Sequence, residues 1–564
     1  MTGWTSLTSE QRDAYFKVIE AQCAKRNLKC IRLESIEESY IGIQLQGCTR
    51  TWDLYVNCSL RSHTSMPRLK LGDPRGLHPH VGYCGTVCVN DGQGLSLDLD
   101  RFEDIVAHTV LAGFDLLEKW AKEAKSDVEF FNELEGYWSG LPDIVIGRAA
   151  VEVDGNDRLV TGYENRSANF AQWFFTEKKV RPPFEFHINK LETKRALYIH
   201  LDGPLIPPVF PDRLTSAFVQ LVRSKLSSSQ AELWSKLVGP SKNGVKKLAL
   251  LISIPREAGG RSLIGVIFTA KNGVIDDQST VYPLTLRRHS SSYMRERGGA
   301  PLELLNKHIA VLGCGAVGSV VADTLASAGI GTLTLVDNDN YTEDNVFRHV
   351  LDPIYIDLSK PEALKDQLER KYPGIKIIPE CKMAEKWLET AKIKELDGIV
   401  IAIGSPTVER SISRDLKSNE YQLPIIFTWL EALDLGGHSI LVWGDAEGCL
   451  DCLYRDDEGA ASLYPQTSFL EPNQNITRNL TGCASIFVPF GALQARKTGL
   501  MAAEHILTAI GREHKPSYRF WTGDGVAASK EGLRTTQWWN LSKSTSQEEA
   551  SRRIFSHPCK RCKR

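Results

Sequence analysis

The sequence lacks an excess of charge of either sign. Its 68 Lys and Arg residues nearly cancel its 69 Asp and Glu residues, which leaves a formal net charge of −1. A protein that holds nucleic acid or an anionic membrane over a broad face needs a positive field there. The totals therefore predict neither nucleic acid nor membrane as a partner, although they do not describe local basic patches.

Long apolar segments are also missing. Residues 1–16, MTGWTSLTSEQRDAYF, have no apolar signal core, and the longest nearly uncharged run, residues 309–322, is too short and too glycine-rich to span a bilayer. We therefore expect a cytoplasmic protein, in which thiols stay reduced. The 13 cysteines are then expected to be core residues, metal ligands or nucleophiles, not a disulfide framework.

No internal repeat or low-complexity tract is visible, and 564 residues are too many for one hydrophobic core. Residues 1–155 combine helical and alternating strand patterns, which predicts a small α+β domain. Residues 156–295 give mixed signals without a chemical motif, and we interpret them as a linker α/β domain. Residues 296–564 alternate strand and helix in the manner of a doubly wound parallel sheet.

The patterns also predict individual elements. Helices are expected at residues 11–26, 101–125, 212–226, 317–329 and 362–372; strands are expected at residues 40–46, 51–60, 184–190, 195–203, 246–254, 265–270, 309–315, 332–337, 375–380 and 398–404.

A glycine-rich motif opens the third region. Gly313, Gly315 and Gly318 form G-x-G-x-x-G between a strand and a helix, and Asp337 closes the next strand. The glycines allow phosphate to approach backbone N–H groups at the helix N-terminus, and the acid suits ribose hydroxyls. A turn without a ligand is the plain alternative, but it leaves the agreement of strand, turn, helix and acid unexplained. The motif alone does not choose between a dinucleotide oxidoreductase and an enzyme that uses ATP.

Polar residues downstream favour ATP. Asn345, Arg348 and Lys360 follow Asp337 in NDNYTEDNVFRH and LSKPEAL. This segment resembles the adenylating domain of ubiquitin-activating enzymes and their ThiF/MoeB relatives. The resemblance implies that Asp337 binds ribose, while the other three hold the ATP phosphates and stabilise charge as a carboxylate displaces pyrophosphate.

The magnesium site departs from the family pattern. The resemblance implies an aspartate after the fourth strand, but Ser405 stands there in IAIGSPTVER, and Arg410 takes the place of a nearby family arginine. Two alternatives stay open: another carboxylate such as Glu409 supports Mg²⁺, or the phosphates hold it.

Two Cys-x-x-Cys pairs lie far apart, at Cys449/Cys452 in EGCLDC and at Cys559/Cys562 in SHPCKRCKR. Four thiolates in two such pairs suit tetrahedral Zn²⁺, and a site with four protein ligands is structural. The alternatives are two unrelated dithiols or redox chemistry at one of them. We predict a zinc site that ties the terminal segment to the nucleotide-binding region, as the resemblance also implies.

Two further cysteines are predicted nucleophiles. Cys483 follows a long loop and precedes a segment that resembles the helix after the family's catalytic cysteine; Arg478 and Arg496 would lower its thiol pKa. Cys88 lies in LHPHVGYCGTVCVND, which resembles the active-site segment of ubiquitin-conjugating enzymes, with His80 in place of the usual asparagine. The oxyanion donor is then either an imidazole N–H or another group. Cys84 is the nearby competitor, at the wrong place in the motif.

An adenylating domain behind a conjugating-type domain resembles the fused activating–conjugating proteins of bacterial anti-phage CBASS operons. The resemblance implies a relay in which ATP adenylates a partner protein's C-terminus, Cys483 takes the acyl group, Cys88 receives it, and a target amine accepts it. The implied partner is a cGAS/DncV-like nucleotidyltransferase, primed for antiviral defence. The resemblance also implies a homodimer in which Arg295 or Arg297 reaches the neighbouring site. Alternatives are activation of a ubiquitin-like or sulfur-carrier protein, or a non-catalytic nucleotide-binding scaffold.

Overall fold

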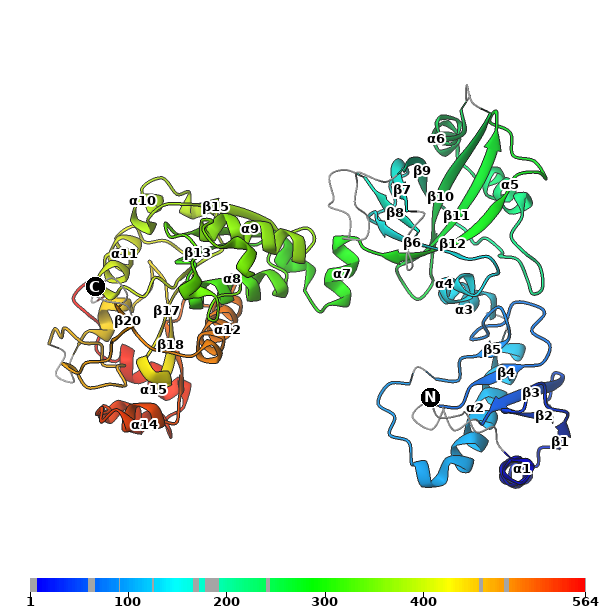
Figure 1. The fold of residues 1–564 in the computed structure, drawn as a ribbon, viewed down its shortest axis with the longest axis horizontal. Coiled ribbons are helices and arrows are strands. Elements are labelled where there is room, and N and C mark those ends of the chain that lie inside the picture. Colours follow the sequence, from blue (N-terminus) through cyan, green and yellow to red (C-terminus); the bar gives the residue numbers. More distant parts are fainter. Residues whose placement is uncertain are drawn as a thin grey trace. The chain divides into compact units, whose positions relative to one another are not determined.

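The structure is a computed structural model of the 564-residue chain, and it forms two compact units, residues 1–290 and 291–564 (Figure 1). It describes residues 8–58, 66–90, 92–123, 126–165, 172–177, 192–239, 244–455, 460–480 and 486–562. Each unit is considered by itself below.

The first unit begins with an antiparallel sheet and two helices. Its five strands, in spatial order, are β1 Cys30–Leu33, β2 Tyr40–Gln46, β3 Thr51–Asn57, β4 Leu69–Leu71 and β5 Thr86–Val87. Alternate residues of β3, such as Trp52 and Leu54, are buried because side chains of a strand point to opposite faces. They form one core with α1 Ser9–Lys25 and α2 Phe102–Lys122.

The rest of this unit is a closed barrel, with strands in the order β10-β11-β12-β6-β8-β7-β9. The strands are β6 Val145–Ala150, β7 Arg158–Glu164, β8 Trp173–Thr176, β9 Glu192–His200, β10 Val245–Pro255, β11 Arg261–Lys271 and β12 Val281–Arg288. Strand β10 is buried on both faces: Leu250 packs with the helices outside the barrel, and Leu251 packs inside it. Those helices are α3 Ser126–Asn132, α4 Leu134–Ser139, α5 Ser216–Ser224 and α6 Ser228–Val238. Because β6 precedes residue 155, the barrel includes a strand that we assigned to the first domain; the division into three domains stays a prediction.

The second unit is built on a seven-stranded sheet in the order β15-β14-β13-β16-β17-β18-β21. Its strands are β13 His308–Leu312, β14 Thr332–Val336, β15 Lys376–Glu380, β16 Gly398–Ile401, β17 Ile425–Leu430, β18 Gly436–Val442 and β21 Ser517–Thr522. The strands from β15 to β17 are parallel, whereas β18 and β21 run antiparallel to their neighbours.

Helices cover both faces of this sheet. Val311 packs with α8 Ala316–Ala328, α9 Lys360–Lys371 and α12 Ala492–Ala509 on one face, and Leu312 packs with α10 Ala384–Leu388 and α11 Pro406–Ser418 on the other. The remaining elements of this unit are α7 Ser291–Arg297, β19 Arg478–Asn479, β20 Ile486–Phe487, α13 Val526–Lys530, α14 Gln537–Ser542, α15 Gln547–Phe555 and short 3-10 turns. The predicted doubly wound α/β fold is confirmed.

The predicted helices and strands agree with the structure within a few residues at their ends. The strand expected over 184–190 lies outside the described residues. Within the part of the chain that the structure describes, no helix combines the length and apolar character needed to cross a membrane.

Candidate functional site

The glycine-rich loop after β13 turns sharply into α8. Gly313 has a φ of +86°, and a Cβ atom there would lie 2.6 Å from the carbonyl oxygen of Ala402. A Cβ atom at Gly318 would lie 1.8 Å from the carbonyl oxygen of Gly313, so only glycine fits both positions. Gly315, the N-cap of this 13-residue helix, has no atom of the other described residues within 4 Å of the position a Cβ would take. An anion can therefore approach the first N–H groups of α8.

Asp337, just after β14, binds the glycine-rich loop. One of its carboxylate oxygens accepts the backbone N–H of Cys314 at 2.6 Å, and the other accepts that of Asp339 at 2.8 Å. An ionised carboxylate has about four acceptor positions, which leaves room for ribose hydroxyls. Lys360, the first residue of α9, is 6% exposed and donates through Nζ to Asp339 at 3.0 Å. Loop, acid and lysine thus meet at the carboxyl edge of the sheet, where such folds bind nucleotides.

Arg348 lies on the wall of a large cavity in the same unit. Its guanidinium carbon is 4.8 Å from the ring centroid of Phe490. Leu480 and Ile486, which flank residues 481–485 in the sequence, line the same cavity of about 770 Å³. The other lining residues are Asp344, Phe347, Leu433, Asp434, Arg478, Phe487, Pro489, Ala492 and Ala527. The cavity thus combines apolar walls with two arginines.

His349 is a buried residue that the sequence analysis missed. The carbonyl oxygen of Asn345 accepts its backbone N–H at 2.9 Å. Its Nδ1 accepts the backbone N–H of Leu351 at 3.1 Å, so its Nε2–H donates to the carbonyl oxygen of Cys314 at 2.7 Å. Burial lowers the pKa of His349 to about 4, which keeps the ring neutral at pH 7. Its position directly after Arg348 was a signal, but a histidine's burial does not show in a sequence.

Ser405 and Glu409 lie where α11 begins. Ser405 is the N-cap residue of this helix. Glu409 is 4% exposed, and it accepts the backbone N–H of Gly404 at 2.9 Å. Burial raises the pKa of Glu409 to about 7, although its backbone hydrogen bonds oppose this. Its carboxyl group is therefore engaged with the loop after β16.

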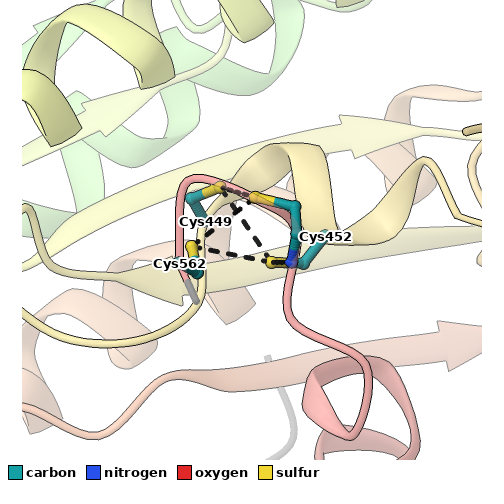
Figure 2. Close-up of side chains that lie close together, drawn as sticks. Cys449, Cys452 and Cys562 are labelled. Atoms are coloured by element: carbon teal, nitrogen blue, oxygen red, sulfur yellow. Dashed lines mark hydrogen bonds between the residues drawn. The ribbon is translucent and has the colours of Figure 1, made fainter. Parts of the chain in front are cut away.

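The two Cys-x-x-Cys pairs meet in one buried cluster. Cys449 and Cys452 come from the turn after β18, and Cys559 and Cys562 follow α15. Figure 2 shows the sulfur atoms of Cys449, Cys452 and Cys562 facing one another. The sulfur–sulfur distances are 4.0 Å for 449–452, 3.5 Å for 449–559, 3.8 Å for 452–562 and 3.7 Å for 559–562. A disulfide needs about 2.0 Å, whereas a Zn–S bond of about 2.3 Å gives a tetrahedron with edges of about 3.8 Å. This donor set fits Zn²⁺.

Asp451, inside the first Cys-x-x-Cys turn, connects this cluster to α11. Its two carboxylate oxygens accept from Arg410 and Arg414, each at 2.7 Å. Burial alone would raise the pKa of Asp451, but the two guanidinium groups outweigh it and lower that pKa. Arg410 thus contacts the cysteine cluster through Asp451.

In the first unit, Cys88 lies on the wall of a cavity of about 420 Å³. Its thiol is exposed, and its backbone N–H donates to the carbonyl oxygen of His80 at 2.7 Å. The other described residues that line the cavity are His78, His80, Val81, Gly82, Thr86, Phe130, Asn132, Glu133, Glu135, Gly136, Tyr137, Arg256 and Ser262. Cys84 is also exposed but is not among them.

The imidazole of His80 faces two carboxylates of α3 and the turn after it. Its Nδ1 lies 2.8 Å from Glu133, and its Nε2 lies 3.4 Å from Glu129. The hydrogen bond to Glu133 raises the pKa of His80. Burial alone would raise the pKa of Glu133, but its bonds with His80 lower it. These three residues are spaced closely enough to hold a metal ion, yet the ion pairing already accounts for their arrangement. Both ring nitrogens are engaged, which favours an oxyanion donor other than His80.

Cys483 lies outside the described residues. Of the two arginines expected beside it, Arg478 forms an ion pair with Glu531, and Arg496 is exposed on α12.

Comparison with known proteins gives the C-terminal unit a family. Residues 292–538 match the ThiF family. The chain is 27% identical over 263 residues to the "ATP-dependent ubiquitin transferase-like protein Cap2" of Pseudomonas aeruginosa, covering 44% of this chain and 46% of that protein. It is 41% identical over 75 residues to the "ubiquitin-like modifier-activating enzyme 5" of Caenorhabditis briggsae, covering 13% of this chain and 17% of that protein. A crystal structure of E. coli MccB with ATP matches with 19% identity and a TM-score of 0.30, over 42% of this chain and 64% of that one.

The chain thus spans less than half the length of these curated relatives. The match, the glycine-rich loop and the sheet order agree with one another. Residues 292–538 are therefore a ThiF-family domain with the ThiF/MoeB adenylating fold, in a chain related to the Cap2 proteins.

Proposed function

We propose that this chain activates the C-terminal carboxylate of a partner protein with ATP and transfers the resulting acyl group through Cys483 and Cys88 to a target amine. The observation that carries the proposal is the ThiF-family domain, in which Asp339 connects Lys360 to Asp337 and Asp337 binds the glycine-rich loop.

The adenylation step follows from these residues. The N–H groups at the start of α8 bind phosphate oxygens, and Asp337 accepts from the ribose. A carboxylate oxygen of the partner attacks the α-phosphorus, the new P–O bond forms, and pyrophosphate leaves with the electrons of the broken one. Arg348 and Lys360 stabilise the negative charge that develops.

Magnesium is the expected companion of ATP in a ThiF-type adenylating enzyme, where it neutralises phosphate charge. Ser405 offers only a hydroxyl, and Glu409 is 4% exposed and bound to Gly404. This favours the alternative in which the ATP phosphates supply most of the ligands of the magnesium ion.

Cys483 is the proposed first nucleophile. Leu480 and Ile486, on either side of its segment, line the cavity that contains Arg348. The thiolate of Cys483 is proposed to receive the acyl group of the adenylate. It attacks the acyl carbon, and AMP leaves.

Cys88 is the proposed second nucleophile. It lies in a cavity of about 420 Å³, a size that suits the end of a peptide and not a folded protein. The thiolate of Cys88 displaces that of Cys483, and a target amine then displaces Cys88 to give an amide. Zn²⁺ on the four-cysteine cluster is proposed as a structural ion that fixes the terminal segment.

The proposed partner is a cGAS/DncV-like nucleotidyltransferase, primed for antiviral defence, because the chain is related to Cap2 proteins. A homodimer through the C-terminal unit is also proposed. Arg295 is 7% exposed and donates to Gly329 of its own chain, so the exposed Arg297 is the better candidate to reach a neighbouring site. Activation of a ubiquitin-like or sulfur-carrier protein is the alternative, since a relative named as a ubiquitin-like modifier-activating enzyme also matches.

ATP–pyrophosphate exchange in the presence of the candidate partner tests the adenylation step. We expect exchange that depends on the partner's intact C-terminus and that Arg348→Ala abolishes. Arg370→Ala on α9, whose arginine pairs with Asp366 on the surface, is the matched control and should retain exchange. Binding of NAD(H) in place of ATP would contradict the proposal, and exchange at the normal rate in Arg348→Ala would contradict that residue's role.

A further inference from the structure

The β10–β11 turn of the barrel is connected to the loop that carries Cys88 through polar residues of α3. The backbone N–H of Ala258 donates to Oδ1 of Asn132 at 3.2 Å. The amide nitrogen of Asn132 donates to Glu129 at 3.2 Å, and Glu129 lies 3.4 Å from His80. The carbonyl oxygen of His80 accepts the N–H of Cys88 at 2.7 Å. A continuous set of polar contacts therefore fixes the barrel turn relative to the nucleophile's backbone.

Two polar side chains of the barrel that line the Cys88 cavity each carry one buried atom without a hydrogen-bond partner among the described residues. Ser262, at the start of β11, is 1% exposed, and its Oγ has no hydrogen-bond partner in the part of the chain that the structure describes. The Nε of Arg256, in the β10–β11 turn, is also buried, and no described residue accepts a hydrogen bond from it. A buried donor left unsatisfied costs stability, so two of them on one cavity indicate a ligand that accepts hydrogen bonds there.

The side chains that line the cavity indicate the chemical class of the ligand. Phe130 and Tyr137 supply apolar surface, and Cys88 supplies the nucleophile. His80 takes the position of the oxyanion donor in the resemblance to conjugating enzymes, but both of its ring nitrogens face carboxylates. The remaining donors suit the carbonyl oxygens of an extended peptide end.

We propose that Arg256 and Ser262 of the barrel form part of an acyl-binding site at Cys88, where their Nε–H and hydroxyl groups donate to carbonyl oxygens of the thioester-linked peptide. This inference rests on the proposed function, because it takes Cys88 as an acyl acceptor. It assigns the barrel a binding role that its sequence did not predict.

The reaction that tests this site needs neither ATP nor the partner. The Cys88 thiolate attacks the carbonyl carbon of a peptide thioester and forms a new C–S bond. The tetrahedral intermediate collapses, the old C–S bond breaks, and the leaving thiolate takes up the proton that Cys88 lost. One thioester is consumed and one is formed.

The probe is the 2-mercaptoethanesulfonate thioester of acetyl-glycyl-glycine, added to the full-length chain. Peptide mapping by mass spectrometry then gives the acylation rate at Cys88 and, in the same sample, at the exposed Cys84. We expect faster acylation at Cys88 than at Cys84 in the unmodified chain. Ser262→Ala and Arg256→Gln should each slow Cys88 about tenfold, the effect of one lost hydrogen bond, and leave Cys84 unchanged. Arg287→Gln, at an exposed barrel arginine outside the cavity, is the control and should change neither rate.

Stability separates a binding role from a structural one. The Ser262 hydroxyl bonds none of the described residues, so Ser262→Ala should leave thermal unfolding unchanged or raise its midpoint slightly while it slows acylation. If Cys88 is acylated faster than Cys84 but neither Ser262→Ala nor Arg256→Gln slows it, the proposed role of the barrel is wrong and the proposed function is unaffected. Equal rates at Cys88 and Cys84 in the unmodified chain would contradict Cys88 as acyl acceptor and overturn both.

Discussion

Replacing His349 with alanine should weaken ATP binding although His349 is not proposed to touch ATP. The ring connects the carbonyl oxygen of Cys314, between two loop glycines, to the backbone N–H of Leu351. His349→Ala leaves both backbone groups buried without partners. Each such group costs about 1–3 kcal/mol, so the loop conformation loses roughly 2–6 kcal/mol of support.

This loss converts into affinity through the population of the binding-competent loop. A variant loop left about 1.3 kcal/mol on the unfavourable side holds the observed geometry for about a tenth of the time, and the apparent Kd for ATP then rises about tenfold. Hydrogen exchange at residues 313–318 should rise in parallel, because fewer contacts hold their backbone.

The pH dependence has a defined sign. The pKa of His349 lies at about 4 in the folded chain, against 6.5 for an ordinary histidine. The unfolded chain therefore binds more protons between these values, and His349 contributes stability that is present above pH 6.5 and lost as pH falls toward 4. The contribution is roughly 3 kcal/mol, and His349→Ala should remove this part of the acid sensitivity.

The matched control is His505→Ala. His505 is 1% exposed in the same unit, its ring nitrogens lie 2.9 Å and 2.8 Å from the hydroxyls of Ser439 and Ser517, and burial lowers its pKa to about 3. Both variants should lose stability, but calorimetric titration should show weaker ATP binding only for His349→Ala. Equal losses of affinity in the two variants would refute the reasoning, because general destabilisation would then explain them.

Three further predictions concern metal, pH and assembly. The purified protein should carry about one Zn²⁺ per chain. Cys559→Ser should lose the ion and raise hydrogen exchange in β21, because the backbone N–H groups of Tyr518 and Phe520 bond side chains of α15. A metal-free protein or an unaffected variant would contradict the zinc site. Because burial raises the pKa of Glu409 from 4.5 to about 7, the free energy of unfolding should fall by roughly 3 kcal/mol as pH rises between these values. Glu409→Gln should flatten this part of the pH dependence measured by urea unfolding, and an unchanged pH dependence would contradict the assignment. Light scattering at working concentration should give a dimer, and a monomer would contradict the proposed pairing.

The doubly wound fold could be predicted because short apolar strands alternate regularly with amphipathic helices along the sequence. The glycine-rich loop was also predictable, since Gly313 and Gly318 admit no other residue at their contacts. The cysteine pairs were predictable from their Cys-x-x-Cys spacing. Only the fold shows that these pairs, 110 residues apart in the sequence, bring their sulfur atoms to distances of 3.5–4.0 Å.

Other features depend on tertiary contacts that leave no local pattern. The closed barrel requires β9 to pair with β10 across about fifty residues, a register that strand periodicity does not encode. His349 and Glu409 owe their shifted pKa values to burial, which is a property of the fold. Arg256 and Ser262 come near Cys88 only because α3 and the barrel turn pack together.

The central claim is a relay from Cys483 to Cys88. Mass spectrometry of variants in which one of these two cysteines is replaced, incubated with partner and ATP, tests it directly. Cys483 is contiguous with the ThiF-family domain that would make the adenylate, so it should be acylated first. Cys483→Ala should leave both cysteines unloaded, whereas Cys88→Ala should leave a reductant-sensitive adduct on Cys483 and no amide product on any target. An adduct on Cys88 in the Cys483→Ala protein would show direct loading and contradict the relay.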